Sequence, residues 1–240
     1  MLTGAGLSTA SGIPDFRSPG GRWSSYQPVP FPDFLASEEA REAYWRYKGE
    51  TWRLIEAARP NPAHMALAEL ARRDRISLLV TQNVDGLHGR SGFPEARLIE
   101  IHGSDSTVTC VGCGLRAERD VAQAAWQAGE AVPRCGCGAP WKPSTISFGQ
   151  GLVPRDLERA LASAASCDLF VAAGTSLAVS PVNGMMQLAV RAGATTAILT
   201  SSETPFDALA DFRVTRPVEE SLPELRERVL GGFGPSSGRP

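Results

Sequence analysis

The sequence has no excess of positive charge and almost no lysine. Its 24 lysine and arginine residues face 26 aspartate and glutamate residues, so the formal net charge is −2 and the isoelectric point is near 6.0. Lys48 and Lys142 are the only lysines. Binding to nucleic acid depends on a positive field that attracts phosphates. A nucleic-acid partner is therefore disfavoured.

Long apolar runs and a secretory leader are also missing. No stretch reaches the roughly 20 apolar residues that a membrane-spanning helix needs, and no charged segment followed by an apolar one marks a signal peptide. We therefore expect a cytoplasmic protein with no membrane partner. The G-x-S-x-G pattern occurs only in the tail (GPSSG, 234–238) and not after a predicted strand, so hydrolysis through a covalent serine has no support.

The sequence does contain buried strands that alternate with helices. Apolar runs predict strands at 76–81, 168–174 and 195–200. Helical patterns occupy 38–58, 63–73, 154–166 and 181–192. Such alternation favours a parallel, doubly wound α/β sheet. With 240 residues, one large domain with a smaller appendage is expected.

Four of the five cysteines form two close pairs, Cys110-x-x-Cys113 and Cys135-x-Cys137, separated by 21 residues. In a reducing compartment such pairs indicate a metal site rather than disulfides. Four thiolates suit tetrahedral Zn²⁺ and leave no open position, so the zinc would be structural. The alternative is a loop of unbound cysteines. Cys167 precedes a predicted strand and is expected in the core.

The segment LTGAGLSTASGIPDFR (2–17) opens the chain with a G-x-G turn of the kind that binds phosphate. Thr9 replaces the third glycine of a dinucleotide fingerprint, and Gly-Ile-Pro-Asp interrupts any following helix. Such a loop should follow a full strand, yet only Met1 and Leu2 precede Thr3. Either the first strand is very short, or residues upstream of Met1 are missing from this chain.

A polar stretch, TQNVDGLH, follows the first predicted apolar strand. It places Gln82, Asn83 and Asp85 at the carboxyl edge of the sheet, where ligands bind in such folds. Amides there can hydrogen-bond a ribose or a carboxamide. The alternative is a turn rich in Asn, Asp and Gly.

Histidine offers the candidate general base. IEIHGS (99–104) is expected to be a strand that ends at His102, and a neutral imidazole is suited to base catalysis near pH 7. The alternative is a structural histidine. His64 and His88 lie on or beside predicted helices and are weaker candidates.

Together, these motifs resemble one family. GAGLSTASGIPDFR, TQNVDGLH, the histidine of IHGS, the four cysteines and GTS (174–176) stand in the order and spacing of a sirtuin, an NAD-dependent protein-lysine deacylase. The resemblance extends from Leu2 to near Leu225. It implies a large domain with a Rossmann-like parallel sheet, and a small domain made of a zinc-binding insertion and a helical insertion.

The expected domain boundaries follow from the motifs and the composition. The NAD-binding domain is expected to be discontinuous, over 1–36, 75–105 and 144–231. The helical insertion is expected at 37–74 and the zinc-binding insertion at 106–143. The tail 232–240 is expected to be disordered.

The resemblance implies an NAD site assembled from several segments. The glycine loop would approach the pyrophosphate, Phe16 would shield the reactive ribose carbon, and Asp85 with the Val84 backbone would hold the carboxamide. The implied NAD contacts are Gly4, Ala5, Gly6, Thr9, Asp15, Phe16, Arg17, Trp23, Gln82, Asn83, Val84, Asp85, His102, Gly174, Thr175, Ser176, Thr200, Ser201 and Val218.

The resemblance also implies the reaction. The oxygen of an acyl-lysine would attack the ribose carbon of NAD, the co-substrate, as nicotinamide leaves. His102 would then deprotonate a ribose hydroxyl, with Gln82 contacting the ribose and Asn83 the catalytic water. The products would be free lysine on the protein substrate, nicotinamide and O-acyl-ADP-ribose.

The stretch KPSTISFGQ (142–150) resembles the substrate-binding segment of the family. Ile146, Phe148 and Gly149 would line the acyl-lysine tunnel, and the backbone would pair with the peptide as a strand. Gln150 stands in place of the family's acid, and Ser144 in place of its usual Asp or Asn. Thr200 likewise replaces a common Asn. These departures bear on the peptide and ribose contacts.

The segment YWRYK (44–48) bears on which acyl group is preferred. Trp45 and Lys48 take the positions at which desuccinylase-like sirtuins carry Tyr and Arg. Lysine lacks the bidentate fork of arginine, so neutral acyl groups, acetyl first, are favoured.

The alternatives to deacylation are ADP-ribosyl transfer or NAD hydrolysis on the same fold, and a non-catalytic NAD-binding module. A zinc-ribbon nucleic-acid binder is disfavoured, because CVGCGLRAERD carries too little basic surface.

Overall fold

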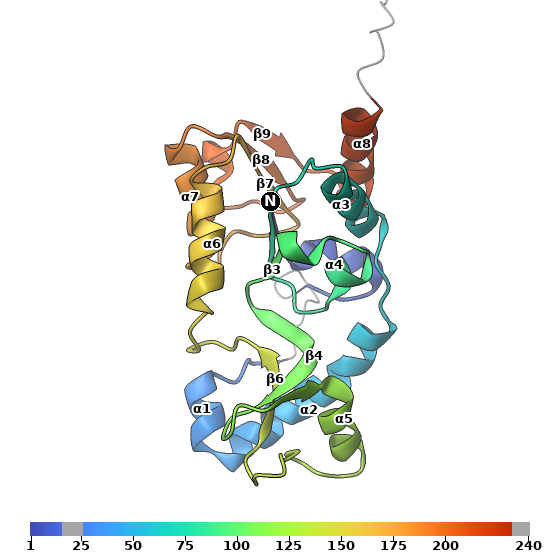
Figure 1. Ribbon diagram of the computed structural model, residues 1–240, viewed down its shortest axis with the longest axis vertical. Coiled ribbons are helices and arrows are strands. Elements are labelled where there is room, and N and C mark those ends of the chain that lie inside the picture. Colours follow the sequence, from blue (N-terminus) through green and yellow to red (C-terminus); the bar gives the residue numbers. More distant parts are fainter. Residues whose placement is uncertain (16–25, 232–240) are drawn as a thin grey trace, which may run out of the picture.

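The computed structural model describes residues 1–15 and 26–231. The molecule is elongated and has two parts (Figure 1): an upper part with a six-stranded sheet and a lower part with a three-stranded sheet. Phe16, Arg17 and Trp23 lie outside the described residues, as does the tail 232–240. The expectations for them stay predictions.

The larger sheet is parallel throughout, as predicted. Its strands are β1 (Leu2–Thr3), β2 (Leu79–Thr81), β3 (Leu98–Glu100), β7 (Leu169–Ala173), β8 (Thr195–Leu199) and β9 (Phe212–Val214). They lie in the order β3-β2-β1-β7-β8-β9. The short β1 is central, because Leu2 pairs with both Val80 and Ala172. The strand order reverses beside β1, and ligands bind beyond the carboxyl ends of strands at such a point.

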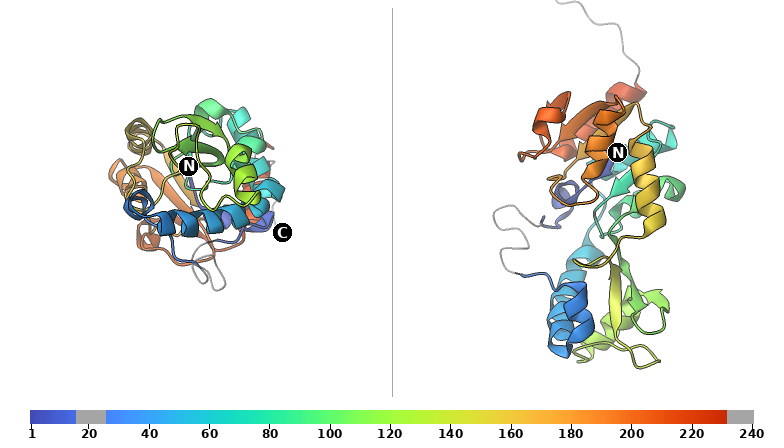
Figure 2. Two further views of the ribbon diagram at one scale, coloured as in Figure 1. Left: turned by 90° about the horizontal axis from the view of Figure 1, so that it is seen from below. Right: turned by 90° about the vertical axis from the view of Figure 1, so that its left-hand side faces the viewer.

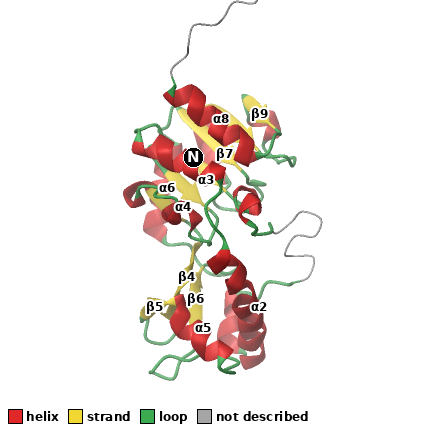
Figure 3. Cartoon of the chain, turned by 90° about the vertical axis from the view of Figure 1, so that its right-hand side faces the viewer, coloured by secondary structure: helices red, strands yellow, loops and turns green. Residues whose placement is uncertain are grey.

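Helices cover both faces of this sheet (Figures 2 and 3). One face packs against α6 (Pro154–Ala164) and α7 (Gly184–Arg191), and the other against α3 (Pro62–Arg72) and α8 (Val218–Leu230). Along β7, Phe170 and Ala172 belong to the first core, whereas Val171 and Ala173 belong to the second. Because both faces are buried, the strands are continuous apolar runs, which is why the sequence reveals them.

The lower part is built on an antiparallel sheet. Its strands are β4 (Gly103–Cys110), β5 (Arg116–Glu118) and β6 (Trp141–Thr145), in the order β5-β4-β6. The helices beside it are α1 (Phe31–Ala36), α2 (Glu38–Ala57) and α5 (Arg119–Gln127), and Figure 3 shows α2 and α5 next to β4 and β6. Phe34, Trp45, Val108 and Trp141 form the core.

The expected helical insertion at 37–74 requires correction. α2 lies in the lower part, but α3 packs on α8 against the large sheet, where Leu67 and Leu222 share one core. A short irregular segment with Pro60 separates the two helices. The smaller sheet also extends beyond the expected 106–143, since Gly103 pairs with Thr145.

The strand expected to end at His102 ends two residues earlier. β3 ends at Glu100 and β4 begins at Gly103, so Ile101 and His102 form the turn between the two sheets. Gly103 has a φ of +72°, and a Cβ there would lie 2.0 Å from the Ser144 carbonyl oxygen. Only glycine fits at this turn between the two sheets.

Among the described residues, no helix is both long enough and apolar enough to cross a membrane.

The contact between α2 and α5 yields a stability prediction. A Cβ added to Gly49 would lie 2.5 Å from the Trp126 ring, whereas one added to Gly184 of α7 meets nothing within 4 Å. Alanine normally favours a helix over glycine. We expect Gly49→Ala instead to lower the free energy of unfolding by about 1–3 kcal/mol through overpacking. Gly184→Ala is the matched control, and urea unfolding measures both. A Gly49→Ala protein as stable as the control would contradict this packing.

Candidate active site

One cavity of about 590 Å³ opens at the carboxyl ends of the parallel strands and extends toward α2 and β6. Every implied site residue within the described ranges lines it, apart from Trp45 and the four cysteines. The set is Gly4, Ala5, Gly6, Thr9, Asp15, Lys48, Gln82, Asn83, Val84, Asp85, His102, Ile146, Phe148, Gly149, Gly174, Thr175, Ser176, Thr200, Ser201 and Val218. Residues far apart in the sequence are thus brought to one place.

The glycine loop enters the cavity by close backbone packing. The Gly6 N–H donates to the Gly174 carbonyl oxygen at 2.8 Å. A Cβ on Gly4 would lie 2.7 Å from the Thr175 Cβ, and a Cβ on Gly174 would lie 2.4 Å from the Leu7 nitrogen. Any larger residue would therefore push the two loops apart. The gap after β1 and β7 stays narrow and lined by backbone, as phosphate binding requires.

A hydrogen-bonded network fixes the polar residues after β2. The Ser8 hydroxyl donates to Asp85 Oδ2 at 2.7 Å, and Asn83 Nδ2 donates to Ser8 Oγ at 3.0 Å. The Leu87 N–H, at the start of α4 (Leu87–Arg90), donates to Asp85 Oδ1 at 2.9 Å. Both oxygens of this buried carboxylate therefore have donors. Sequence reasoning missed Ser8, although a hydroxyl two residues after Gly6 was a usable signal.

Gln82 links the two sides of the cavity. Its Nε2 donates to Thr175 Oγ1 at 2.8 Å, and its backbone N–H donates to the Thr3 carbonyl oxygen at 3.0 Å. The ends of β1, β2 and β7 are therefore held together at the site.

His102 has the geometry of a general base. Its Nδ1 lies 3.1 Å from the Gln82 carbonyl oxygen, which can only accept, so Nδ1 carries the proton and donates. Nε2 is then left with its lone pair. Burial lowers the pKa of His102 below 6.5, and the hydrogen bond to Gln82 partly opposes this shift. The ring is therefore neutral at pH 7 and able to accept a proton.

The segment after β6 forms another wall. The Ile146 N–H donates to the His102 carbonyl oxygen at 2.7 Å, and the Phe31 N–H donates to the Phe148 carbonyl oxygen at 2.8 Å. The Phe148 side chain is 51% exposed at this wall. Gln150 Oε1 accepts from the Ser147 N–H at 3.2 Å, so it closes its own turn.

The expectation that Trp45 contacts substrate is wrong. Trp45 is fully buried in the lower core, and its indole N–H donates to the Trp141 carbonyl oxygen at 2.9 Å. Tyr44 and Tyr47, which sequence reasoning missed, line the cavity with Lys48. Tyr44 stands three residues before Tyr47 and four before Lys48, so these three side chains share the cavity face of α2. Trp45, although three residues before Lys48, packs into the lower core instead.

Lys48 already has a partner. Its Nζ lies 2.7 Å from Asp105 Oδ2, and its side chain is 12% exposed. Asp105 Oδ1 in turn binds the buried Arg119 at 3.0 Å. A carboxylate entering the cavity would therefore compete with Asp105 for the ammonium group.

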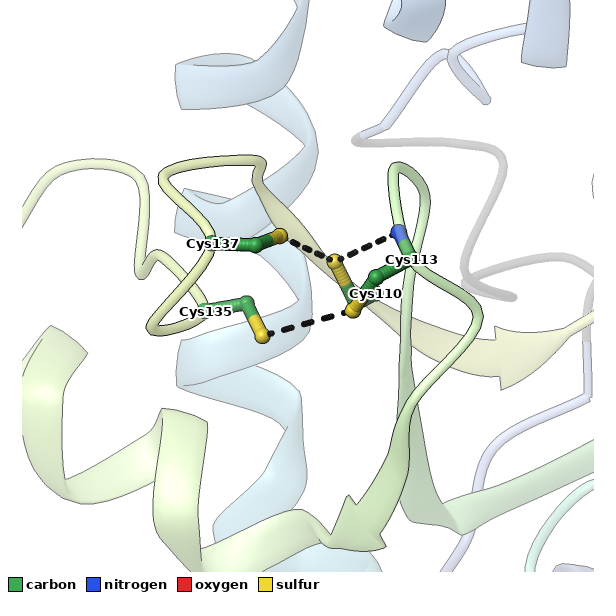
Figure 4. A group of neighbouring side chains, drawn as sticks. All are labelled: Cys110, Cys113, Cys135 and Cys137. Carbon is green, nitrogen blue, oxygen red and sulfur yellow. Dashed lines mark hydrogen bonds between the residues drawn. The ribbon is translucent and has the colours of Figure 1, made fainter.

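The four cysteines meet at one point in the lower part, away from the cavity. Figure 4 shows their thiols pointing toward one another. The sulfurs lie within 4.8 Å of one another, with 3.4 Å between Cys110 and Cys137 and 3.8 Å between Cys113 and Cys135. Zinc with four sulfurs at about 2.3 Å in a tetrahedron separates them by about 3.8 Å. The donor set thus fits a closed structural zinc site.

Comparisons with known proteins agree with this geometry. A model described as the Sir2 family matches residues 4–181. The NAD-dependent protein deacetylase 1 of Bradyrhizobium diazoefficiens is 42% identical over 222 residues, covering 92% of this chain and 87% of that protein. The NAD-dependent protein deacetylase of Saccharolobus solfataricus is 39% identical, covering 95% and 90%. A solved structure described as Sir2 with p53 peptide and NAD+ has a TM-score of 0.86 at 32% identity, covering 94% of this chain and 90% of that chain.

The thiol cluster predicts how the protein responds to loss of one ligand. We expect about one zinc per chain in the purified protein and much less in Cys135→Ser, with a lower melting temperature, because metal binding contributes to folding. Cys167→Ser, outside the cluster, is the control and should keep the metal. Metal analysis and thermal unfolding measure both. Full zinc content and unchanged melting in Cys135→Ser would exclude the site.

Proposed function

The chain belongs to the Sir2 family and is an NAD-dependent protein-lysine deacylase, and we propose that the cavity described above carries out the reaction. The observation that carries this proposal is the single space shared by the glycine loop, the Gln82–Asp85 network and His102. His102 is neutral there and keeps one nitrogen free to accept a proton.

NAD, when bound, supplies a ribose carbon that loses nicotinamide and takes up the acyl oxygen, so the acyl group leaves as O-acyl-ADP-ribose. The chain's own part is to bind and to move protons. We assign the pyrophosphate to the loop of Gly4, Ala5 and Gly6, whose backbone approaches Gly174 closely. Asp85 and the Val84 backbone are assigned to the carboxamide.

The remaining assignments follow the walls of the cavity. Thr9, Asp15 and Gln82 belong to the nicotinamide and ribose side, and Asn83 orients a hydroxyl or water beside His102. Those assigned to the phosphate, second ribose and adenine half are Gly174, Thr175, Ser176, Thr200, Ser201 and Val218. His102 accepts the proton from a ribose hydroxyl.

The substrate side is assigned to the wall after β6. Ile146, Phe148 and Gly149 would contact the acyl-lysine and its peptide. Lys48 remains a proposed acyl contact, and its ion pair with Asp105 favours a neutral acyl group over a carboxylate. Acetyl-lysine proteins are therefore the proposed substrates.

The domain division and the location are also proposals. We assign α3 to the NAD-binding domain and α2 to the smaller domain, and otherwise keep the expected discontinuous arrangement. A cytoplasmic location is supported by the four-cysteine cluster, whose geometry suits a metal site, the use of paired cysteines that is typical of a reducing compartment.

The proton-accepting role of His102 can be tested directly. We expect His102→Ala to lower NAD-dependent deacetylation of an acetyl-lysine peptide by at least about 10²-fold, the contribution of a general base. NAD affinity should change little, because this ring is one of many cavity contacts. Mass spectrometry of acetyl- and succinyl-lysine peptides, with and without NAD, measures the acyl loss and ranks the two groups.

The same spectra separate the alternatives. Appearance of acetyl-ADP-ribose supports deacylation, whereas free ADP-ribose alone would indicate NAD hydrolysis. Transfer of ADP-ribose to the peptide or to another protein would indicate a different acceptor. Wild-type activity in His102→Ala would remove this residue from the mechanism.

The buried environment of His102 also predicts a pH profile. Since burial lowers its pKa below 6.5, the neutral, active form persists to lower pH than for a free imidazole. We expect kcat/KM to fall with decreasing pH through a midpoint below 6.5. Rates on the acetyl peptide from pH 5 to 8 measure this. A midpoint above 6.5 would contradict the assignment.

A further inference from the structure

Two buried histidines lie outside the cavity and have no part in the reaction as proposed. His64 of α3 is 0% exposed and His88 of α4 is 1% exposed. Their ring centroids are 4.9 Å apart, with an interplanar angle of 59°. The chain has three histidines in all. A buried imidazole is costly unless its ring nitrogens are hydrogen-bonded.

The tautomer of His64 follows from the N-terminus of its helix. The Asn61 N–H donates to His64 Nδ1 at 3.4 Å, within a capping box in which Asn61 Oδ1 accepts from the Ala63 and His64 N–H groups. Burial lowers the pKa of His64 to about 4, with Asp85 opposing the shift and Arg90 adding to it, so the ring is neutral at pH 7. Its proton is therefore on Nε2.

Each of the two rings has one nitrogen without a partner. His64 Nε2 and His88 Nδ1 are buried, and neither has a hydrogen bond within the described part of the chain. His88 Nε2 lies 3.1 Å from Thr3 Oγ1. Burial and the neighbouring His64 hold the pKa of His88 well below 6.5, so this ring is neutral too.

The two unpartnered nitrogens have complementary roles. His64 Nε2 carries a proton, so a bond between the two adjacent rings requires His88 Nδ1 to be the acceptor. His88 then carries its proton on Nε2 and donates to Thr3 Oγ1. With the opposite tautomer of His88, both unpartnered nitrogens would carry a proton and could not bond to each other.

We propose that His64 and His88 are positioning residues that form a directed hydrogen-bond relay from the N-terminus of α3 to β1. The order is Asn61 N–H to His64, His64 Nε2–H to His88 Nδ1, and His88 Nε2–H to Thr3 Oγ1. The middle bond is the inferred one: the two rings are adjacent, and neither of these nitrogens has another partner among the described residues.

Through Thr3, the relay would position the start of the glycine loop. Thr3 is the last residue of β1 and directly precedes Gly4, and its carbonyl oxygen accepts from the Gln82 N–H. β1 has two residues, so few ladder bonds hold it. Asn61 Nδ2 also donates to the Leu7 carbonyl oxygen at 2.8 Å. The N-terminus of α3 therefore holds the glycine loop at both of its ends.

Nitrogen-15 NMR of the full-length protein tests the tautomers. The relay requires the Nε2–H tautomer in both His64 and His88, whereas His102 should show the Nδ1–H tautomer because it donates to Gln82. Single His→Gln variants assign the three rings. An Nδ1–H tautomer in His88, or titration of either buried ring near pH 6.5, would overturn the relay. This measurement needs no enzymatic activity.

A pair of variants separates positioning from mere support of the fold. His64→Asn keeps an acceptor for the Asn61 N–H but has no donor for His88. His64→Gln does the reverse. We expect both variants to lower the melting temperature, because each leaves a buried polar group unpaired. Only His64→Asn should raise the Kd for NAD, about five- to tenfold, whereas His64→Gln should keep it within about twofold of wild type.

The outcomes are distinct. A Kd for NAD that changes in step with the melting temperature in both variants would show a structural role only, as would a Kd unchanged in both. A raised Kd in His64→Asn alone, at a similar loss of melting temperature in both variants, supports the relay. This part depends on the proposed NAD site: if the wild-type chain fails to bind NAD in calorimetry, the proposed function fails, while the tautomers still decide the relay.

Discussion

The pairing of Leu2 and Thr3 between β2 and β7 is the constraint from which the site follows. Two residues of strand place the glycine loop beside Gly174, with no room for a Cβ between the two backbones. The same pairing sets the end of β2, and with it Gln82 and Asp85, at the rim of the cavity. β1 lies where the strand order reverses and has only two residues, so it needs further hydrogen bonds to hold it and its loop in place. The side chains of Ser8, Asn61 and Gln82 provide them.

A second connection joins the two parts of the molecule. Asp105 of β4 binds Lys48 of α2 and Arg119 of α5, and its backbone N–H donates to the Val84 carbonyl oxygen at 2.8 Å. The lower part is thereby tied to the same loop that lines the cavity. Removing one buried ion from such a cluster leaves the others uncompensated. The zinc-bearing part therefore has a direct physical path to the site, although its thiols lie elsewhere.

The sequence predicts both the strands and the cavity wall, because polar or glycine-containing motifs directly follow the apolar runs. Apolar runs end at Gln82 and Gly174, and buried parallel strands produce such runs. It does not predict the side of α2 that faces the cavity, because all five residues in YWRYK are aromatic or basic and none marks the phase of the helix. The sequence also predicts α3 as part of the helical insertion, because α3 follows α2 closely. The break at Pro60 does not reveal which sheet the next helix packs against. The tautomer of His88 depends on His64 and Thr3, which are distant from it in sequence.

The scarcity of lysine acquires a meaning once both lysines are located. Lys48 is held by Asp105 with 12% of its side chain exposed, and Lys142 is buried, donating to the carbonyl oxygens of Pro143 and Thr145. An enzyme that removes acyl groups from lysine thus presents scarcely any lysine of its own. It is a poor target for reactive acyl donors and a poor substrate for a second copy of itself. Its positive surface charge comes from arginine, which such donors do not readily modify. Acylation of surrounding proteins would therefore leave the charge and the solubility of this protein unchanged.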